Sequence, residues 1–354
     1  AKESLLVKSF APRLGVSRPT LFNDLDDVER WLHGHDLLLI RRPGFGFKVE
    51  GSELKTRNAL EEIVLDSAGQ MSLLAYIQGN TADSTFSLEK FSLGMEQISR
   101  ICEVSFDFVE PEFLTEKIEE LSSIQFTDSS HVALVLFFSI LLERVQTRNF
   151  LTEFPYPTPN LLETKEHWTA QEIARIIKER ERLDLNQEEV ANIAAHLMCI
   201  KGLQSLDNYD VNATSVMNDA EIEQILDEMI HEAAGLLHPI LNVDQQLRQG
   251  LRYHIRPAIN RLYFGRPIQN NLLPEIKSQY SYIYEVAEKT GKILQDWLGI
   301  QVPEAEIGYL AMHFGAALER QRSLLTNRIK TIIVCGVQET LEAGSLAAAA
   351  AGGM

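Results

Sequence analysis

The sequence predicts a mainly α protein, in which a small N-terminal head precedes two tandem all-α helical bundles. Three observations lead to this prediction. Residues 1–57 read as helix, tight turn, helix and hairpin, apolar residues recur at helical spacing over most of 58–325, and the two halves of that stretch share a motif. We therefore expect domains at 1–57, 58–205 and 206–325, followed by a short C-terminal piece, 326–354.

Length and composition are those of an intracellular globular protein. The chain has 354 residues, of which 45% are hydrophobic and 23% charged, so two or three domains with apolar cores are expected. The three cysteines are scattered, which predicts neither a disulfide framework nor a zinc site. Neither a long apolar run nor a signal-peptide pattern is present, so we expect a cytoplasmic protein without membrane insertion.

The charge is distributed unevenly along the chain. A net charge of −17 argues against nucleic-acid binding by the chain as a whole. Residues 1–57, however, hold ten basic and eight acidic side chains, a net +2, which leaves −19 for the rest. Binding to a phosphate backbone is therefore expected at the head.

The head has the capping and turn residues of a helix-turn-helix. Gly15 is expected to be the left-handed C-cap of a short first helix. Ser17 is then the N-cap of a longer helix with Pro19 in its first turn, and the apolar stripe of that helix runs to Leu32. The segment "LLLIRRPGFGFKVEG" follows as two short strands around a Pro-Gly turn.

The pattern "LGVSRPTLFNDL" resembles the winged helix-turn-helix of bacterial regulators, over residues 5–51. The resemblance implies that the start of the second helix enters the major groove, while the hairpin contacts phosphate or the minor groove. The first helix is shorter than usual, so the domain is expected to be incomplete at its N-terminus. A helix–hairpin packing module with surface arginines is the alternative. The candidate DNA-binding residues are Ser17, Arg18, Thr20, Asn23, Arg41 and Arg42.

The two bundles share a repeat. "EVANIAAHL" (189–197) matches "EIGYLAMHF" (306–314), and "LLERVQTRNF" (141–150) can be laid on "AINRLYFGRP" (258–267), which pairs Arg144 with Arg261. At 100° per residue, the polar residues of these motifs fall on helix flanks beside the apolar stripes. The flank residues are Glu306, Tyr309, His313 and Arg320 in one helix, His254 and Arg261 in another, and Glu189 and His196 in the first bundle.

Histidines on such flanks suit three roles. They can be structural groups at the core edge, metal ligands, or acceptors of a phosphoryl group from a partner. His254, His313 and Glu306 could supply three metal ligands, but nearby arginines oppose a cation and favour a phosphate. The arginines concerned are Arg256, Arg261 and Arg320.

With these motifs, the two bundles resemble tandem PTS regulation domains (PRDs). These are helical modules of transcriptional activators and antiterminators governed by the sugar phosphotransferase system. The resemblance covers about 58–325 and is greatest to activators of the mannitol operon. It implies phosphorylation of histidines on an early and a late helix by the phosphocarrier HPr or by sugar-specific EIIA and EIIB components. By this resemblance, the phosphorylated histidines correspond to His254 in "YHIRPAINRLYFGRPIQN", to His313 in "EIGYLAMHFGAALER" and to His196 in "EVANIAAHL". The expected neighbours of the phosphorylation sites are Arg261, Glu306, Arg320 and Arg256.

The first bundle departs from the family pattern. His254 and His313 are 59 residues apart, whereas the residue 59 positions before His196 is Phe137. His131 lies six residues upstream of Phe137 and can substitute only if the helix register shifts. We therefore expect one usable site in this bundle.

The C-terminal piece reads differently. "RIKTIIVCG" predicts a buried strand that ends at Cys335 and resembles the first strand of a IIB transport component. The Gly-rich loop that should follow is absent, so this module is expected to be truncated and Cys335 inert. "SLAAAAAGGM" is expected to be a disordered tail.

These features predict a homodimeric, DNA-binding activator of a sugar-uptake operon, with mannitol as the first candidate sugar. The expected partners are operator DNA, HPr and EIIA or EIIB, with neither a cofactor nor a metal and without enzyme activity. One alternative is an RNA-binding antiterminator with the same regulatory domains, which would carry a β-rich head. Another is a metal-dependent helical enzyme, although the sequence has no HExxH-type cluster.

Overall fold

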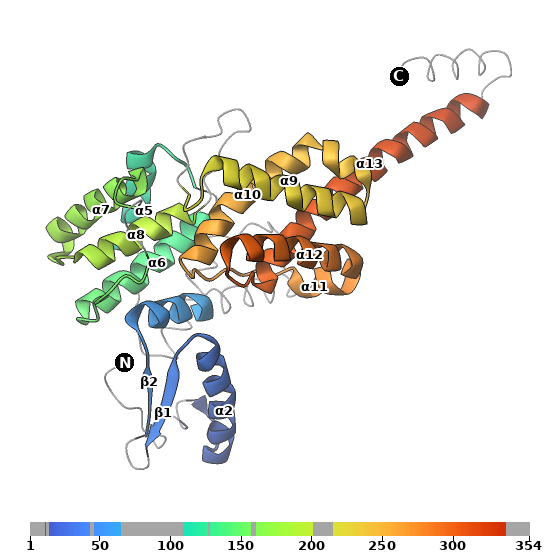
Figure 1. Cartoon of the computed structure of the whole chain (residues 1–354). Helices are drawn as coiled ribbons and strands as arrows, with labels where there is room; N and C mark the ends of the chain where they lie inside the picture. The colour runs from blue at the N-terminus through green and yellow to red at the C-terminus, as the bar shows by residue number, and fades with distance from the viewer. Residues whose placement is uncertain are drawn as a thin grey trace. The chain divides into compact units, whose positions relative to one another are not determined.

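The structure is a computed structural model. It describes residues 11, 14–42, 46–64, 109–126, 128–156, 161–200 and 215–337. As predicted, the chain is mainly helical (Figure 1). It divides into two compact units. Unit 1 comprises the described residues up to 216 together with 257–269, and unit 2 comprises 217–256 and the described residues from 270 onwards.

The head opens unit 1 with the turn that the sequence predicts. Gly15 has φ +66, the left-handed conformation that glycine adopts without steric cost at a helix C-terminus. Helix α2 (Arg18–Gly34) follows, and Ser17 is its N-cap because its Oγ accepts a hydrogen bond of 3.2 Å from the Thr20 backbone N–H.

The predicted hairpin consists of β1 (Leu38–Arg42) and β2 (Gly46–Glu50). The strands pair antiparallel in a register that places Leu38 opposite Glu50 and Arg42 opposite Gly46. Residues 43–45 of the turn lie outside the described residues. The hairpin and α2 share an apolar core, whose buried members are Ala11, Leu21, Leu25, Leu32, Leu37, Leu39, Phe47 and Ala59.

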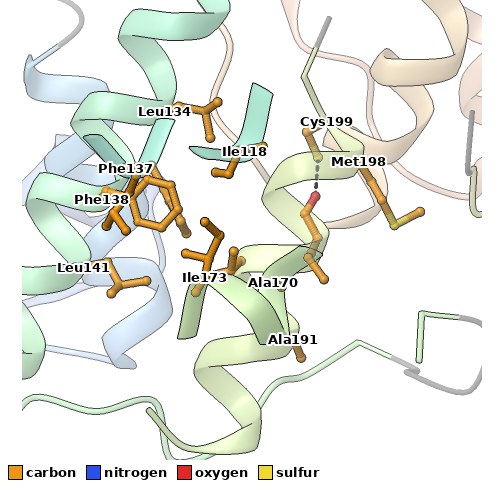
Figure 2. Packing of buried hydrophobic residues seen from close by; sticks show 14 of the residues in the cluster. Ile118, Leu134, Phe137, Phe138, Leu141, Ala170, Ile173, Ala191, Met198 and Cys199 are labelled. Carbon is orange, nitrogen blue, oxygen red and sulfur yellow. Dashed lines mark hydrogen bonds between the residues drawn. The ribbon is translucent and has the colours of Figure 1, made fainter. Parts of the chain in front are cut away.

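The rest of unit 1 is a helical bundle. Its elements are a connecting helix (described over 53–64), α5 (Val109–Ser122), α6 (Asp128–Gln146), α7 (Lys165–Glu181) and α8 (Gln187–Met198). Figure 2 shows their core, in which Phe138 and Leu141 of α6 and Ile173 of α7 are fully buried. The Cys199 thiol donates a 3.1 Å hydrogen bond to the Ala195 carbonyl. Residues 65–108 lie outside the described residues.

Unit 2 is a second helical bundle. Its elements are α9 (Asp219–Leu236), the 3₁₀ turn η1 (Pro239–Val243), the first part of α10 (Gln245–Tyr263), α11 (Leu273–Gln279), α12 (Ser281–Leu298) and α13 (Glu304–Val337). A capping box between Asn218 and Glu221 starts α9. Leu251 and Ile255 of α10 are fully buried, as are Leu310 and Phe314 of α13, so both predicted apolar stripes face a core.

Helix α10 belongs to both units. One division between the units falls between Arg256 and Pro257, within this helix, and the others fall between residues 216 and 217 and between residues 269 and 270. Residues 201–214 lie outside the described residues. Pro257 has no N–H, so it cannot donate the usual helical hydrogen bond to the residue four positions earlier.

The strand predicted over "RIKTIIVCG" is wrong, because α13 continues as helix to Val337. The β-branched residues of this segment favour strand only where a pleated partner is present. The described strands, β1 and β2, pair with each other. Residues 338–354, which include the predicted disordered tail, lie outside the described residues. In the described part of the chain, no helix has the length and apolar character needed to cross a membrane.

Candidate functional site

Helices α10 and α13 bring the two histidines of unit 2 together. The ring centroids of His254 and His313 lie 5.3 Å apart. His254 Nε2 lies 3.0 Å from Glu306 Oε2, and its ring centroid lies 5.5 Å from that of Tyr309. Glu306, Tyr309 and His313 occupy positions i, i+3 and i+7 of α13, so one face of this helix supplies all three contacts.

The two histidines differ in accessibility. His254 is 2% exposed and Glu306 1% exposed, whereas His313 is half-buried. A buried carboxylate needs a charged or hydrogen-bonding partner, and the His254 imidazole lies at that distance from Glu306. A reactant arriving from solvent therefore meets His313 before it meets His254.

The arginines expected around these histidines have other contacts. Arg256 Nη2 lies 2.5 Å from Asp219 Oδ1 on α9, and Arg320 Nη2 lies 3.1 Å from Asp244 Oδ2. Arg261 belongs to unit 1, where Nη1 donates a 3.2 Å hydrogen bond to the Cys199 carbonyl. Helix periodicity could not reveal the partners of these arginines, because those partners lie on other elements.

The corresponding place in unit 1 lacks the histidine pair. The His196 ring on α8 stacks on Phe137 of α6, with centroids 4.0 Å apart and an interplanar angle of 17°. Burial and the nearby Arg266 guanidinium hold the pKa of His196 well below its usual range. Within the described part of the chain, neither His196 ring nitrogen has a hydrogen-bond partner. His196 is therefore a neutral ring inside the core. His131 is half-buried on α6, and Phe137 rather than His131 contacts His196.

Glu189, the repeat counterpart of Glu306, has an arginine as its partner. Arg57 of the connecting helix binds it through two hydrogen bonds, of 2.7 Å from Nη1 to Oε2 and 2.8 Å from Nη2 to Oε1. Arg57 Nε also donates a 2.9 Å hydrogen bond to Glu53, and Glu53 accepts two hydrogen bonds from Arg144. This buried ion-pair network ties the helix that follows the hairpin to the bundle. Sequence analysis missed Arg57, because its partner is 132 residues away.

A second buried polar cluster surrounds Arg266. Its Nη2 donates to the side chain and carbonyl of Asn192, at 2.5 and 3.1 Å. Burial raises the pKa of the Glu61 carboxyl on the connecting helix to about 7, although the Arg266 charge opposes the rise. This cluster was not predicted either, because its members come from three distant segments.

In the head, the predicted DNA-binding residues divide into two groups. Arg18 and Asn23 are exposed at the start of α2, and Arg42 is exposed at the end of β1. The Ser17 and Thr20 hydroxyls lie 2.7 Å from each other in the N-cap. Arg41 does not extend from the hairpin as expected, because its guanidinium donates to Asp26 at 2.8 Å and to Glu29 at 2.6 Å. It therefore fastens β1 to α2.

A metal centre has no support in the described residues, among which no group of three or more His, Cys, Asp or Glu side chains is arranged to hold a metal ion. The His254, His313 and Glu306 cluster is thus a pair of imidazoles beside a carboxylate.

Both bundles match the PRD domain family, one over residues 112–198 and the other over 227–317. The chain therefore belongs to the proteins that carry PRD domains, with two copies. The second match includes His254, Glu306 and His313, and the first includes Phe137 and His196.

Curated relatives of the chain are named as regulators of transcription or as antiterminators. The chain is 27% identical over 340 residues to "Probable licABCH operon regulator" of Bacillus subtilis, covering 95% of this chain and 48% of the relative. It is 26% identical over 332 residues to "Transcriptional regulator ManR" of the same organism, covering 93% and 46%. It is 35% identical over 97 residues to "GlcA/glcB genes antiterminator" of Staphylococcus carnosus, covering 26% and 34%. The chain thus spans about half the length of the first two relatives.

Proposed function

We propose that this chain is the regulatory and DNA-binding part of a cytoplasmic, homodimeric transcription regulator controlled by the sugar phosphotransferase system. Phosphorylated HPr, or an EIIA or EIIB component, transfers a phosphoryl group to His313 and then His254. The observation that carries this proposal is the cluster in unit 2, where a half-buried and a buried imidazole lie 5.3 Å apart beside a buried carboxylate.

The switch follows from electrostatics. A phosphoryl group brings about −1.5 to −2 charges, by analogy with other phosphorylated side chains. On His313 this charge arrives close to His254, which is in contact with Glu306. Repulsion from the Glu306 carboxylate then favours a different packing of α10 against α13. A change of that kind biases two conformations of the protein and so alters operator affinity.

The test is phosphotransfer from radiolabelled HPr to the wild-type chain and to histidine variants. We expect His313→Ala to remove most of the label, and the His254→Ala, His313→Ala double variant to remove nearly all of it. His196→Gln should change the label little, because that ring is buried against Phe137. Unchanged labelling of the double variant would refute the proposal.

The head is proposed to bind operator DNA through Arg18 and Asn23, with Arg42 at the phosphate backbone. Losing one base contact costs about 1–3 kcal/mol of binding free energy, so Arg18→Ala should weaken binding by roughly fivefold or more. Arg30→Ala is the matched control, because Arg30 is exposed beside Asp27, away from the start of α2. Equal affinities of the two variants would contradict this placement.

The second candidate is an RNA-binding antiterminator, which the similarity to the GlcA/glcB genes antiterminator favours. The helical head argues against it. Gel-shift titrations with duplex DNA and with an RNA hairpin separate the two candidates. The mannitol operon remains the first operon to test, with the licABCH operon beside it because of the similarity to the licABCH relative.

A further inference from the structure

A glycine in the middle of α10 lies against His313. Gly250 is a helical residue without positive φ, so the backbone does not require glycine there. In a helix interior, glycine is less favourable than alanine, because its backbone loses more conformational freedom on folding. Some other constraint must therefore account for it.

The constraint is the close approach of the imidazole. A Cβ atom at Gly250 would lie 3.1 Å from Nδ1 and 3.3 Å from Cε1 of His313, and all other His313 atoms, Nε2 included, are beyond 4 Å. Contacts of 3.1 and 3.3 Å are tighter than nine in ten that Cβ atoms make. His254 follows Gly250 by four residues, so both lie on the face of α10 that meets α13.

We propose that Gly250 is a positioning residue for phosphoryl transfer to His313. By lacking a side chain, it lets the Nδ1–Cε1 edge of the ring pack on α10, and Nε2, which lies farther from the Gly250 Cβ position, is the nitrogen proposed to receive the phosphoryl group. This inference deepens the proposed function and rests on it, because the proposed function identifies the protein that donates the phosphoryl group in the cell.

The chemistry can be tested without any protein donor. Phosphoramidate gives its phosphoryl group to the lone pair of Nε2: its P–N bond breaks, a new P–N bond forms, ammonia leaves, and the ring keeps its proton on Nδ1. The site and rate are followed by mass spectrometry of the His313 peptide. The nitrogen is identified by proton–phosphorus correlation NMR, with His313→Gln to assign the signal.

The variants are Gly250→Ala and Gly250→Val, with Gly235→Ala and Gly235→Val as matched controls. Gly235 lies in α9, and a Cβ there would meet nothing within 4 Å. Because misplacing a reacting group by about 1 Å can cost roughly 100-fold in rate, we expect labelling of His313 to fall about threefold in Gly250→Ala and at least tenfold in Gly250→Val. Thermal stability of Gly250→Ala should stay close to wild type, since the gain in helix propensity from alanine offsets the shift of a few tenths of an ångström that its Cβ imposes on His313.

Three results decide whether Gly250 positions His313 for phosphoryl transfer. Slower labelling in the Gly250 variants at retained stability, with phosphate on Nε2 in the wild type, supports the positioning role. Equal rates in the Gly250 and Gly235 variants, or phosphate on Nδ1 in the wild type, overturn it. If HPr fails as a donor while the phosphoramidate pattern holds, the proposed function fails and the role of Gly250 stands.

Discussion

Arg57 offers the sharpest test of how the head is joined to the first bundle. Its guanidinium is 5% exposed and binds both oxygens of Glu189, whose side chain has no solvent exposure. Arg57→Met keeps most of the side-chain volume but removes the charge. The Glu189 carboxylate then remains buried, with the Leu151 N–H at 2.8 Å as a hydrogen-bond donor.

The magnitude follows from this burial. Removing one partner of a buried ion pair costs about 3–5 kcal/mol, because the remaining charge stays desolvated. Glu189→Gln should cost less, about 1–3 kcal/mol. Arg57 would still donate hydrogen bonds to Glu53 at 2.9 Å and to the Asn149 carbonyl at 2.8 Å. The double variant should therefore lose less than the two single losses combined, with a coupling of about 2 kcal/mol.

The assay is urea unfolding followed by tryptophan fluorescence. Trp31 and Trp168 lie in unit 1 and Trp297 in unit 2, so Trp297→Phe confines the signal to unit 1. The control is Lys178→Met, which breaks an exposed pair with Asp184 and should cost less than about 1 kcal/mol. If Arg57→Met costs no more than Lys178→Met, the network does not hold the connecting helix and the reasoning is refuted.

Two further predictions concern unit 1. The native state keeps the proton of Glu61 up to its raised pKa of about 7, whereas the unfolded chain loses it near pH 4.5. As the pH rises from 4.5 to 7, the free energy of unfolding therefore falls, by about 3 kcal/mol at most. Glu61→Gln should therefore gain stability relative to wild type between about pH 5 and pH 8, measured by urea midpoints, and a pH-independent difference would contradict this. Ser17→Ala should destabilise the head by about 1 kcal/mol, while Ser17→Asp, which keeps an acceptor for the Thr20 N–H, should not. Equal melting of the two Ser17 variants, followed through Trp31, would show that the cap does not contribute.

The sequence predicted those features that depend on local rules. Gly15, the Ser17 cap and the hairpin follow from turn and capping chemistry within a few residues, and the faces of α10 and α13 follow from helical periodicity. These rules placed His254, Glu306 and His313 on flanks that meet in space. The IIB-like strand was a local inference too, and it was wrong because strand propensity depends on a partner.

The features that were missed depend on distant contacts. Arg57 and Glu189 are separated by 132 positions, and no spacing rule connects them. The burial of His254 and the acid partners of Arg256 and Arg320 likewise depend on how α9, α10 and α13 pack. Gly250 did carry a local signal, since a glycine in the middle of a strongly amphipathic helix has a cost that calls for a reason.

The assignment of residues 257–269 to unit 1 has a practical consequence for dissecting the protein. Phe264 is 2% exposed and contributes to the core of the first bundle. Asn260 Nδ2 donates a 2.7 Å hydrogen bond to the Met198 carbonyl. A fragment cut at the predicted boundary after residue 205 would leave this core with a phenylalanine-sized hole and an unsatisfied carbonyl. The complementary fragment would expose Phe264 to water. Expression of the first regulatory domain by itself therefore requires that the second half of α10 be supplied with it, as a linked or separate peptide.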